Sequence, residues 1–260
     1  MSGAPKKSLG QHWLFDSKSL GDICDAAELT PDDTVLEIGP GLGPLTVELT
    51  ARAKQVIAVE LDERLARELP ARVPAANLKV VHTDVLHFDL SQLPTGYKVV
   101  ANVPYYITSL IVRFLLESPT PPSRAVLLVQ KEVAERLAAR PGDMSILAIS
   151  AQLYAEVQLG PVVTADKFDP PPKVHSQVVT FVQRAAPLFK DLNTKLFFRI
   201  VKAGFGEKRK TLRNSLSGGL AMQKDEIELL LGKAGIDPSA RAEALSLEQW
   251  HALTILYSQK

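Results

Sequence analysis

The chain has 260 residues, of which 46% are hydrophobic and 23% charged, and its formal net charge at pH 7 is +1. This length suits one large domain, or a domain of about 150–190 residues with a small second one, and the composition is that of a globular protein. No apolar run approaches the roughly 18 residues of a membrane span, and none follows the basic start at residues 1–11. With one cysteine, Cys24, no internal disulfide can form, so we expect a cytoplasmic protein.

The first 155 residues alternate short apolar runs with amphipathic segments. The apolar runs predict strands at 34–38, 55–60, 78–82, 97–101 and 125–130. The segments with helical periodicity predict helices at 17–29, 42–53, 62–69, 108–117 and 131–139. Strands that alternate with helices in this way indicate an α/β fold with a parallel, doubly wound sheet.

The pattern changes after about residue 155. Two runs at 156–163 and 174–182 predict strands with no long helix between them, which suits an antiparallel pair at the end of the sheet. From residue 187 onward the sequence predicts helices, at 193–204, 207–216, 224–233 and 246–257. We therefore expect two domains, 1–186 and 187–260, with the boundary where 185–187 (AAP) interrupts the strand pattern.

A glycine-rich turn at 37–43 (EIGPGLG) closes the first long strand and opens a helix. Glycines at such a turn let the backbone approach a ligand closely. A dinucleotide fingerprint requires Gly-x-Gly-x-x-Gly, but Pro44 stands where its third glycine would be. The carboxylate of Glu37 would also repel a pyrophosphate. The turn therefore favours a cofactor that carries a sulfonium and an amino group over a dinucleotide.

Two further acidic residues follow the next two strands. Glu60 ends the second strand, where a carboxylate can accept both hydroxyls of a ribose, and Asp84 follows the third, where it can accept from an adenine amino group. Each alone could be a solvated residue or a helix cap. Together with the glycine turn they lie on successive strand ends, the edge at which such sheets bind ligands.

After the fourth strand comes the element 102–105 (NVPY). The exocyclic nitrogen of adenine is a poor nucleophile, because its lone pair is delocalised into the ring. The side-chain oxygen of Asn102 and the carbonyl of Val103 can accept its two hydrogens, and Tyr105 can stack on an extruded base. The alternative is a β-turn and helix cap with packed tyrosines. In combination with the glycine turn, the element indicates methyl transfer to an adenine amino group.

Five motifs give the chain a resemblance to the ribosomal RNA adenine N6-dimethyltransferases, and within them to the small-subunit (16S) rRNA dimethyladenosine transferases. The motifs are 9–14 (LGQHWL), 37–43, 102–105, 168–176 (FDPPPKVHS) and 205–216 (FGEKRKTLRNSL). The resemblance covers nearly the whole chain. It implies a Rossmann-like S-adenosylmethionine-dependent methyltransferase sheet, which would be the catalytic domain, followed by a small all-helical RNA-binding domain.

The resemblance also implies roles for single residues. The residues implied to bind S-adenosylmethionine are His12, Leu14, Gly39, Glu60, Asp84 and Asn102. Asn102 would act in catalysis with Tyr105 and Phe168, whose rings would sandwich the flipped base. The implied target is a pair of adjacent adenosines in a hairpin near the 3′ end of small-subunit rRNA, each receiving two methyl groups. The sequence departs from the family at His12, where many relatives have Asn, and at 144–145 (MS), where Tyr-Gly is expected.

A basic block predicts where RNA binds. Residues 190–213 contain eight basic and two acidic residues, a local balance of 8 − 2 = +6. A basic block in a neutral protein suggests a polyanion partner, although it can also be a solvated helix face. We expect Lys208, Arg209, Lys210 and Arg213 to contact RNA phosphates, with support from Lys6 and Lys7. The partner would be the rRNA of the immature small ribosomal subunit.

Three other functions stay open at this point. The first is a large-subunit rRNA adenine methyltransferase, and the second is a ribosome-assembly factor that mainly binds rRNA. The third is an NAD-dependent enzyme, which the missing third glycine argues against. The five histidines and the single cysteine have no metal-ligand spacing, so we expect no metal. We expect a monomer.

Overall fold

The computed structural model describes residues 11–207 and 209–259, which form two compact units. The first unit contains the chain up to Glu135 and residues 155–183, and the second contains 136–154 and everything from Arg184 onward. The division expected from the sequence, at 186/187, differs from this one mainly in the segment 136–154. That segment belongs to the second unit because Met144, Ile149 and Leu153 lie in its hydrophobic core.

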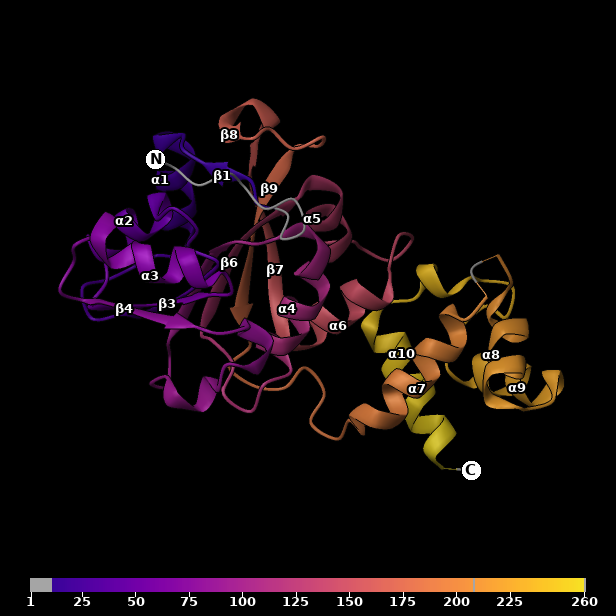
Figure 1. Cartoon of the computed structure of the whole chain (residues 1–260). Helices are drawn as coiled ribbons and strands as arrows, with labels where there is room; N and C mark the ends of the chain where they lie inside the picture. The colour runs from indigo at the N-terminus through magenta and orange to yellow at the C-terminus, as the bar shows by residue number, and fades with distance from the viewer. Residues whose placement is uncertain (1–10, 208, 260) are drawn as a thin grey trace. The chain divides into compact units, whose positions relative to one another are not determined.

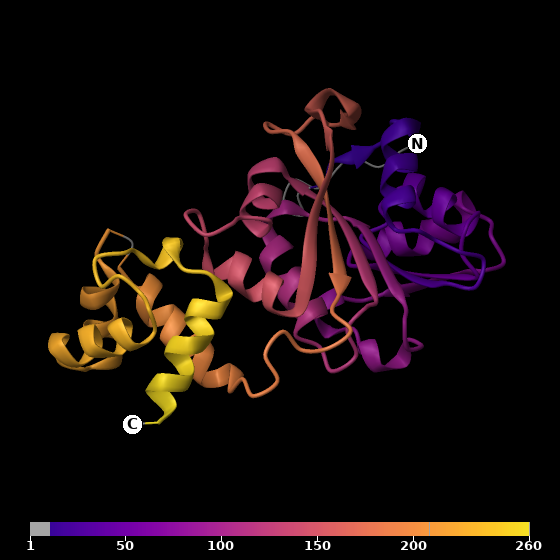
Figure 2. The ribbon, with the colours of Figure 1, turned by 180° about the vertical axis from the view of Figure 1, so that it is seen from behind.

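The first unit is built on one sheet with the strand order β4-β3-β2-β5-β6-β9-β7 (Figure 1). Five neighbouring strands are parallel, as expected from the alternation of strands and helices. They are β2 (Thr34–Ile38), β3 (Gln55–Glu60), β4 (Leu78–His82), β5 (Lys98–Asn102) and β6 (Arg124–Gln130). The antiparallel strands β7 (Ala155–Val163) and β9 (Ser176–Gln183) complete the sheet at its end, which confirms the expected pair. Figure 2 shows these two long strands from behind.

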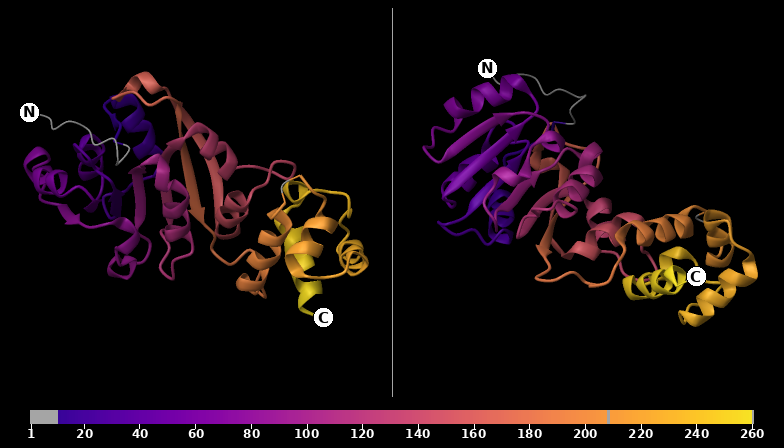
Figure 3. Two further views of the ribbon diagram at one scale, coloured as in Figure 1. Left: turned by 45° about the vertical axis from the view of Figure 1, so that its right-hand side comes forward. Right: turned by 90° about the horizontal axis from the view of Figure 1, so that it is seen from below.

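Helices cover the sheet. The helices of the first unit are α1 (Ser17–Ala26), α2 (Pro44–Thr50), α3 (Glu63–Arg72), α4 (Thr108–Leu116) and the greater part of α5 (Lys131–Leu137), seen from two further directions in Figure 3. Alternate strand residues pack against α1 and α2, because successive side chains of a strand point to opposite faces. This part of the core includes Leu20, Ile23, Leu45, Leu49, Val35, Val56, Val100 and Val126.

The second unit contains α6 (Ile146–Tyr154), α7 (Thr194–Phe205), α8 (Leu212–Leu220), α9 (Lys224–Lys233) and α10 (Leu247–Ser258). The fully buried indole of Trp250 on α10 packs against α7, where a Cβ atom at Gly204 would collide with its ring. In this unit, two elements differ from the sequence prediction. Helix α6 was not expected, and the helix expected at 207–216 begins only at Leu212, after a turn in which Lys210 N–H donates to the carbonyl of Glu207.

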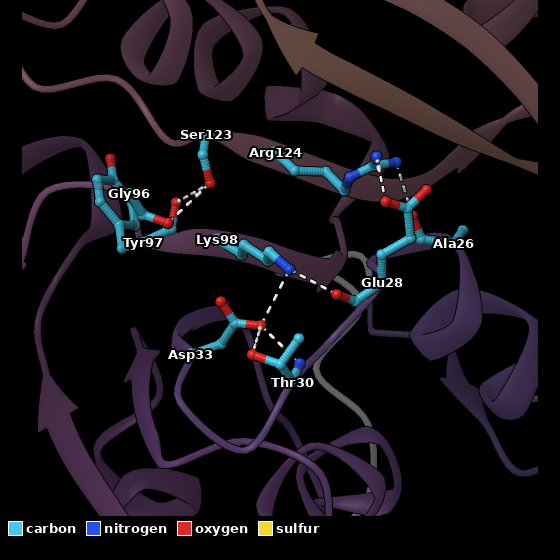
Figure 4. Close-up of polar contacts among 9 residues, drawn as sticks. All are labelled: Ala26, Glu28, Thr30, Asp33, Gly96, Tyr97, Lys98, Ser123 and Arg124. Atoms are coloured by element: carbon cyan, nitrogen blue, oxygen red, sulfur yellow. Dashed lines mark hydrogen bonds and ion pairs between the residues drawn. The ribbon is translucent and has the colours of Figure 1, made fainter.

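Polar contacts hold the amino ends of β5 and β6 to the loop after α1 (Figure 4). The Lys98 ammonium lies 2.9 Å from the carboxylate of Asp33 and donates to the carbonyl of Glu28 at 2.6 Å. The Arg124 guanidinium pairs with the Glu28 carboxylate at 2.7 Å. These contacts fix the edge of the sheet opposite to the one at which β2, β3 and β5 present their carboxyl ends. That second edge carries the candidate site.

Candidate active site

A pocket lies at the carboxyl ends of β2, β3, β4 and β5. Its lining brings together all six residues expected to bind a cofactor and one further residue expected in catalysis. They are His12, Leu14, Gly39, Glu60, Asp84, Asn102 and Tyr105. Residues from the start of the chain and from four strand ends thus share one cavity, as the topology of a doubly wound sheet predicts.

The start of the described chain forms one wall of this pocket. Strand β1 (Trp13–Leu14) pairs antiparallel with β8 (Phe168–Asp169). The indole of Trp13 covers the glycine turn so closely that a Cβ atom at Gly41 would lie 2.9 Å from its Nε1. Gly41 also has φ +60°, a conformation that side chains disfavour. The contact between Trp13 and the turn could not be predicted, because no sequence pattern relates Trp13 to Gly41.

Asn102 ends β5 and is held by the start of the chain. Its side-chain amide Nδ2 donates to the backbone carbonyl of His12 at 3.1 Å. This bond uses a donor of the amide and leaves Oδ1 as an acceptor at the pocket. Next to it, Val103 is anchored to β6 by its backbone N–H, which donates to the carbonyl of Leu128 at 3.2 Å. One backbone hydrogen bond therefore orients the Asn102 amide, and another holds the backbone of Val103 beside it.

Tyr105 lies beside Asn102 at the start of a short 3-10 turn (Tyr105–Ile107). Its hydroxyl makes a 2.7 Å hydrogen bond with the hydroxyl of the fully buried Ser176. Burial raises the pKa of Tyr105, with a smaller opposing effect from Ser176, so the phenol is neutral. The imidazole of His12 stacks on the tyrosine ring with 6.0 Å between ring centroids, and its Nδ1 donates to the carbonyl of Pro170 at 2.7 Å.

The carboxylates of Glu60 and Asp84 are held in different ways. Glu60 is 6% exposed and accepts from the backbone N–H of Gly41 at 3.0 Å and of Asp62 at 2.9 Å. Burial raises its pKa, while these two donors act in the opposite direction. Asp84 is partly exposed and accepts from the N–H of Leu86 at 3.0 Å. The Glu60 carboxylate thus connects the end of β3 to the glycine turn, and the Asp84 carboxylate caps the turn that follows β4.

Phe168 lies in the core rather than in the lining of the pocket. It faces Leu14 across the β1–β8 pair, is 4% exposed, and belongs to the same hydrophobic cluster as Val178. In the described part of the chain, the ring that stacks on Tyr105 is that of His12. The expected role of Phe168 as the second wall of a base sandwich stays a prediction.

The basic block lies in the second unit. Arg209 is exposed, Lys210 pairs with Glu207, and the guanidinium of Arg213 lies 3.2 Å from the carboxylate of Glu228. Glu228 was not counted in the charge balance of the block, because it follows 15 residues later on α9. Lys208 lies outside the described residues, as do Lys6, Lys7 and the first two residues of the 9–14 motif.

The described residues contain neither a cluster of metal ligands nor a helix that could span a membrane. No group of three or more His, Cys, Asp or Glu side chains is placed to hold a metal ion within 11–207 and 209–259. No helix in the same ranges combines the length and the apolarity that crossing a membrane requires.

The sequence of the chain matches a known protein family over nearly its whole length. Residues 4–259 match the model of the family described as ribosomal RNA adenine dimethylase. The chain is 43% identical over 258 residues to the ribosomal RNA small subunit methyltransferase A of Dehalococcoides mccartyi strain 195, covering 98% of this chain and 89% of the relative. It is 41% identical over 263 residues to the protein of the same name from Geobacillus sp. strain WCH70, covering 96% and 90%.

Two solved structures share the fold over nearly the whole chain. The dimethyladenosine transferase of Plasmodium falciparum superimposes with a TM-score of 0.82 at 27% identity, covering 95% of this chain and 97% of that one. The 23S rRNA methyltransferase ErmE superimposes with a TM-score of 0.78 at 33% identity, covering 95% and 100%. Both similarities extend over the sheet and the C-terminal helices.

Proposed function

Because the chain belongs to the ribosomal RNA adenine dimethylase family, we propose that its pocket transfers methyl groups from S-adenosylmethionine to small-subunit rRNA. The acceptors are the N6 amino groups of two adjacent adenosines in a hairpin near the 3′ end of that RNA. The observation that supports this most directly is the fixed amide of Asn102, whose oxygen is left as an acceptor at the pocket.

The residues present fit the donor. Gly39, with φ +67°, and Gly41 leave the floor of the pocket without side chains, so that a ligand can approach the backbone. Glu37 is a buried acid in the lining of the pocket, which suits the positive charges of S-adenosylmethionine. Glu60 would hold the ribose and Asp84 the adenine, while His12 and Leu14 would lie at the methionine end. When bound, the donor supplies a methyl group on a sulfonium.

The chain's own residues then act on the target nitrogen. Asn102 Oδ1 and the Val103 carbonyl accept the two amino hydrogens, which turns the lone pair of the nitrogen out of the ring plane. These dipoles are fixed before the reaction by the bonds to His12 and Leu128, so little reorganisation is needed. A strong base is not required, because the nitrogen becomes acidic as it is alkylated. The base must first leave the RNA stack, at a cost of roughly a few kcal/mol, which contacts elsewhere supply.

The Asn102→Ala variant tests this proposal. It removes the fixed acceptor and leaves the cofactor contacts of Glu60 and Asp84 in place. We expect methyl transfer to fall by at least about 10²-fold, the loss typical of removing one preorganised group, with RNA binding retained. Transfer is measured as dimethyladenosine formed in small-subunit rRNA. A variant that still methylates at the wild-type rate contradicts the role of Asn102, and loss of RNA binding in parallel shows a folding defect instead.

The structural similarity to ErmE supports a second candidate, an enzyme that acts on large-subunit rRNA. The higher identity to relatives named as small-subunit methyltransferases favours the first. Parallel assays on immature small subunits and on naked large-subunit rRNA separate the two. We expect transfer to the small subunits only.

A further inference from the structure

The ammonium of Lys167 connects two segments that lie far apart in the sequence. Lys167 ends the 3-10 turn Ala165–Lys167, directly before β8. Its Nζ lies 2.9 Å from the carboxylate of Asp16 and 3.2 Å from the hydroxyl of Ser19, 151 and 148 residues earlier in the chain. The side chains of Lys167 and Asp16 are each 30% exposed. Their ion pair joins the segment that leads into β8 to the segment that follows β1.

Asp16 is held in place from its own side of this ion pair. Its carboxylate caps α1, accepting from the hydroxyl of Ser19 at 2.5 Å and from the Ser19 N–H at 2.8 Å. The hydrogen bonds from Ser19 and Lys167 lower the pKa of Asp16 to about 2, so the carboxylate is charged at neutral pH. The ammonium of Lys167 therefore meets an acceptor that is both charged and fixed to a helix.

Residues 11–16 form an arm, of which 11–14 line the pocket. Within the arm, β1 pairs with β8 through two residues on each strand (Figure 1). At one end of this pair the imidazole of His12 donates to the carbonyl of Pro170 at 2.7 Å, and at the other end stands the ion pair of Asp16 and Lys167. Two short paired strands are at best marginally stable in water by themselves. The side-chain contacts at the two ends therefore decide how firmly the arm is held.

We propose that Lys167 is a positioning residue, whose ion pair with Asp16 holds the arm against the donor pocket. The inference rests on the proposed function. With the arm in place, the carbonyl of His12 orients the Asn102 amide, and the Trp13 indole covers the glycine turn. Without the ion pair, the arm leaves the pocket in a larger share of the molecules. The apparent affinity for the donor then falls with the fraction of molecules that keep the arm in place.

The size of the expected effect follows from the partial exposure of the ion pair. Such a pair changes an equilibrium constant by about fivefold at most, and salt screens it. We therefore expect Lys167→Met to bind S-adenosylhomocysteine, the donor without its methyl group, about two- to fivefold more weakly at low salt. The difference from the wild type should shrink toward about 1 M salt, where the screening length is about 3 Å.

Calorimetric titration of the whole chain with S-adenosylhomocysteine, at low and at high salt, measures these affinities. Lys167→Arg keeps the positive charge and should restore binding. The matched control is Lys173→Met, which removes an exposed lysine six residues later and should bind as the wild type does.

A variant of Asp16 tests the ion pair from its other side. Asp16→Asn loses the charge but keeps a side chain that caps helices well, so α1 should stay intact. It should bind S-adenosylhomocysteine as weakly as Lys167→Met. The double variant should lose no more affinity than either single variant, because both remove the same interaction.

Trp13 reports the position of the arm directly. The chain has two tryptophans, and the other, Trp250, is fully buried in the second unit. Quenching of tryptophan fluorescence by acrylamide should therefore increase in Lys167→Met and return toward the wild-type level when S-adenosylhomocysteine saturates the pocket. A residue that only stabilised the fold would not make the exposure of Trp13 depend on the ligand.

The proposal is overturned if Lys167→Met binds S-adenosylhomocysteine as tightly as the wild type at low salt. It is also overturned if the loss of affinity persists undiminished at high salt, or if the losses of Lys167→Met and Asp16→Asn add in the double variant. If the wild type itself does not bind S-adenosylhomocysteine at any salt concentration, the proposed function fails instead.

Discussion

The amide of Asn102 is oriented by a backbone atom 90 residues earlier in the chain. The sequence motif supplies the chemical group, but the direction in which the amide points depends on the carbonyl of His12. A backbone carbonyl has no signature in a sequence, so this contact could not be predicted. The same is true of the Tyr105–Ser176 hydrogen bond, whose partners lie 71 residues apart. Residue types that carry chemistry were recognisable, whereas the contacts that hold them were not.

For single residues, we predict different effects on methyl transfer from two substitutions of Tyr105. Tyr105→Phe removes the hydroxyl bonded to Ser176 but keeps the ring, so methyl transfer should fall by less than about tenfold. Tyr105→Ala removes the stacking surface, which is worth about 1–3 kcal/mol per base, and transfer should fall by about 10- to 100-fold. Both are measured as kcat/KM on small-subunit rRNA.

The matched control is Ser176→Ala, which removes the same hydrogen bond from the other side and should resemble Tyr105→Phe. An alanine at position 105 that leaves transfer unchanged would show that the ring does not contact the target base.

Among the elements, those with strong local periodicity were predictable and those without it were not. The five parallel strands are apolar runs, and they lie where the sequence places them. Helix α6 (ILAISAQLY) was missed because its apolar residues are not confined to one face. The β1–β8 pair was missed because each strand has two residues, and the pairing joins segments about 154 residues apart. Long-range pairing of such short strands leaves no pattern in either segment.

The ion pair between Lys98 and Asp33 at the amino end of β5 leads to a prediction about stability. Lys98→Met should lower the free energy of unfolding by about 1–3 kcal/mol, because it leaves the largely buried carboxylate of Asp33 without its ammonium partner. Burial opposes the charge of Asp33, but the hydrogen bonds from Lys98 and Thr30 outweigh it and lower its pKa. The stabilisation is therefore present at neutral pH and is lost as the pH falls below the ordinary value of 3.8.

Denaturant unfolding at neutral and acidic pH measures this difference. The control is Lys18→Met, which breaks the exposed Lys18–Asp22 pair on α1 and should have no measurable effect. Equal losses from the two variants, or a Lys98→Met deficit that persists in acid, would contradict the role given to Asp33.

For the molecule as a whole, composition and pattern predicted two parts, a sheet with helices followed by helices alone. The structure has two units, and its boundary near residue 184 lies close to the expected one. That 136–154 belongs to the second unit could not be predicted. Its apolar residues form the same sequence pattern whether they pack in the core of the first unit or in that of the second. The proposed division of labour between a catalytic part and an RNA-binding part stays a prediction.

For the molecule as a whole, we predict that RNA binding depends on the basic block at 190–213. Binding of the methyl donor should not depend on this block. Reversing the charge of the exposed Arg209 together with Lys210 should lower the affinity for RNA. The slope of log affinity against log salt concentration should become shallower by about 1–2. The affinity for S-adenosylhomocysteine should stay unchanged, because the pocket belongs to the first unit. Filter binding across a range of salt concentrations measures the slope. Binding that does not respond to salt in the wild type would remove the basis for an electrostatic RNA surface.

The position of β9 has a consequence for how the chain is made. This strand lies between β6 and β7 although it is synthesised after both, so the edge of β6 stays open and β7 has no neighbour until Gln183 has left the ribosome. By then the segment that contains α6 has also been made, and its apolar residues lack their packing partners until α7 to α10 have been synthesised. All residues of the first unit have therefore been made once Gln183 is made, whereas the second unit cannot fold until α7 to α10 follow. A nascent chain that stops short of β9 exposes a strand edge on which aggregation can start.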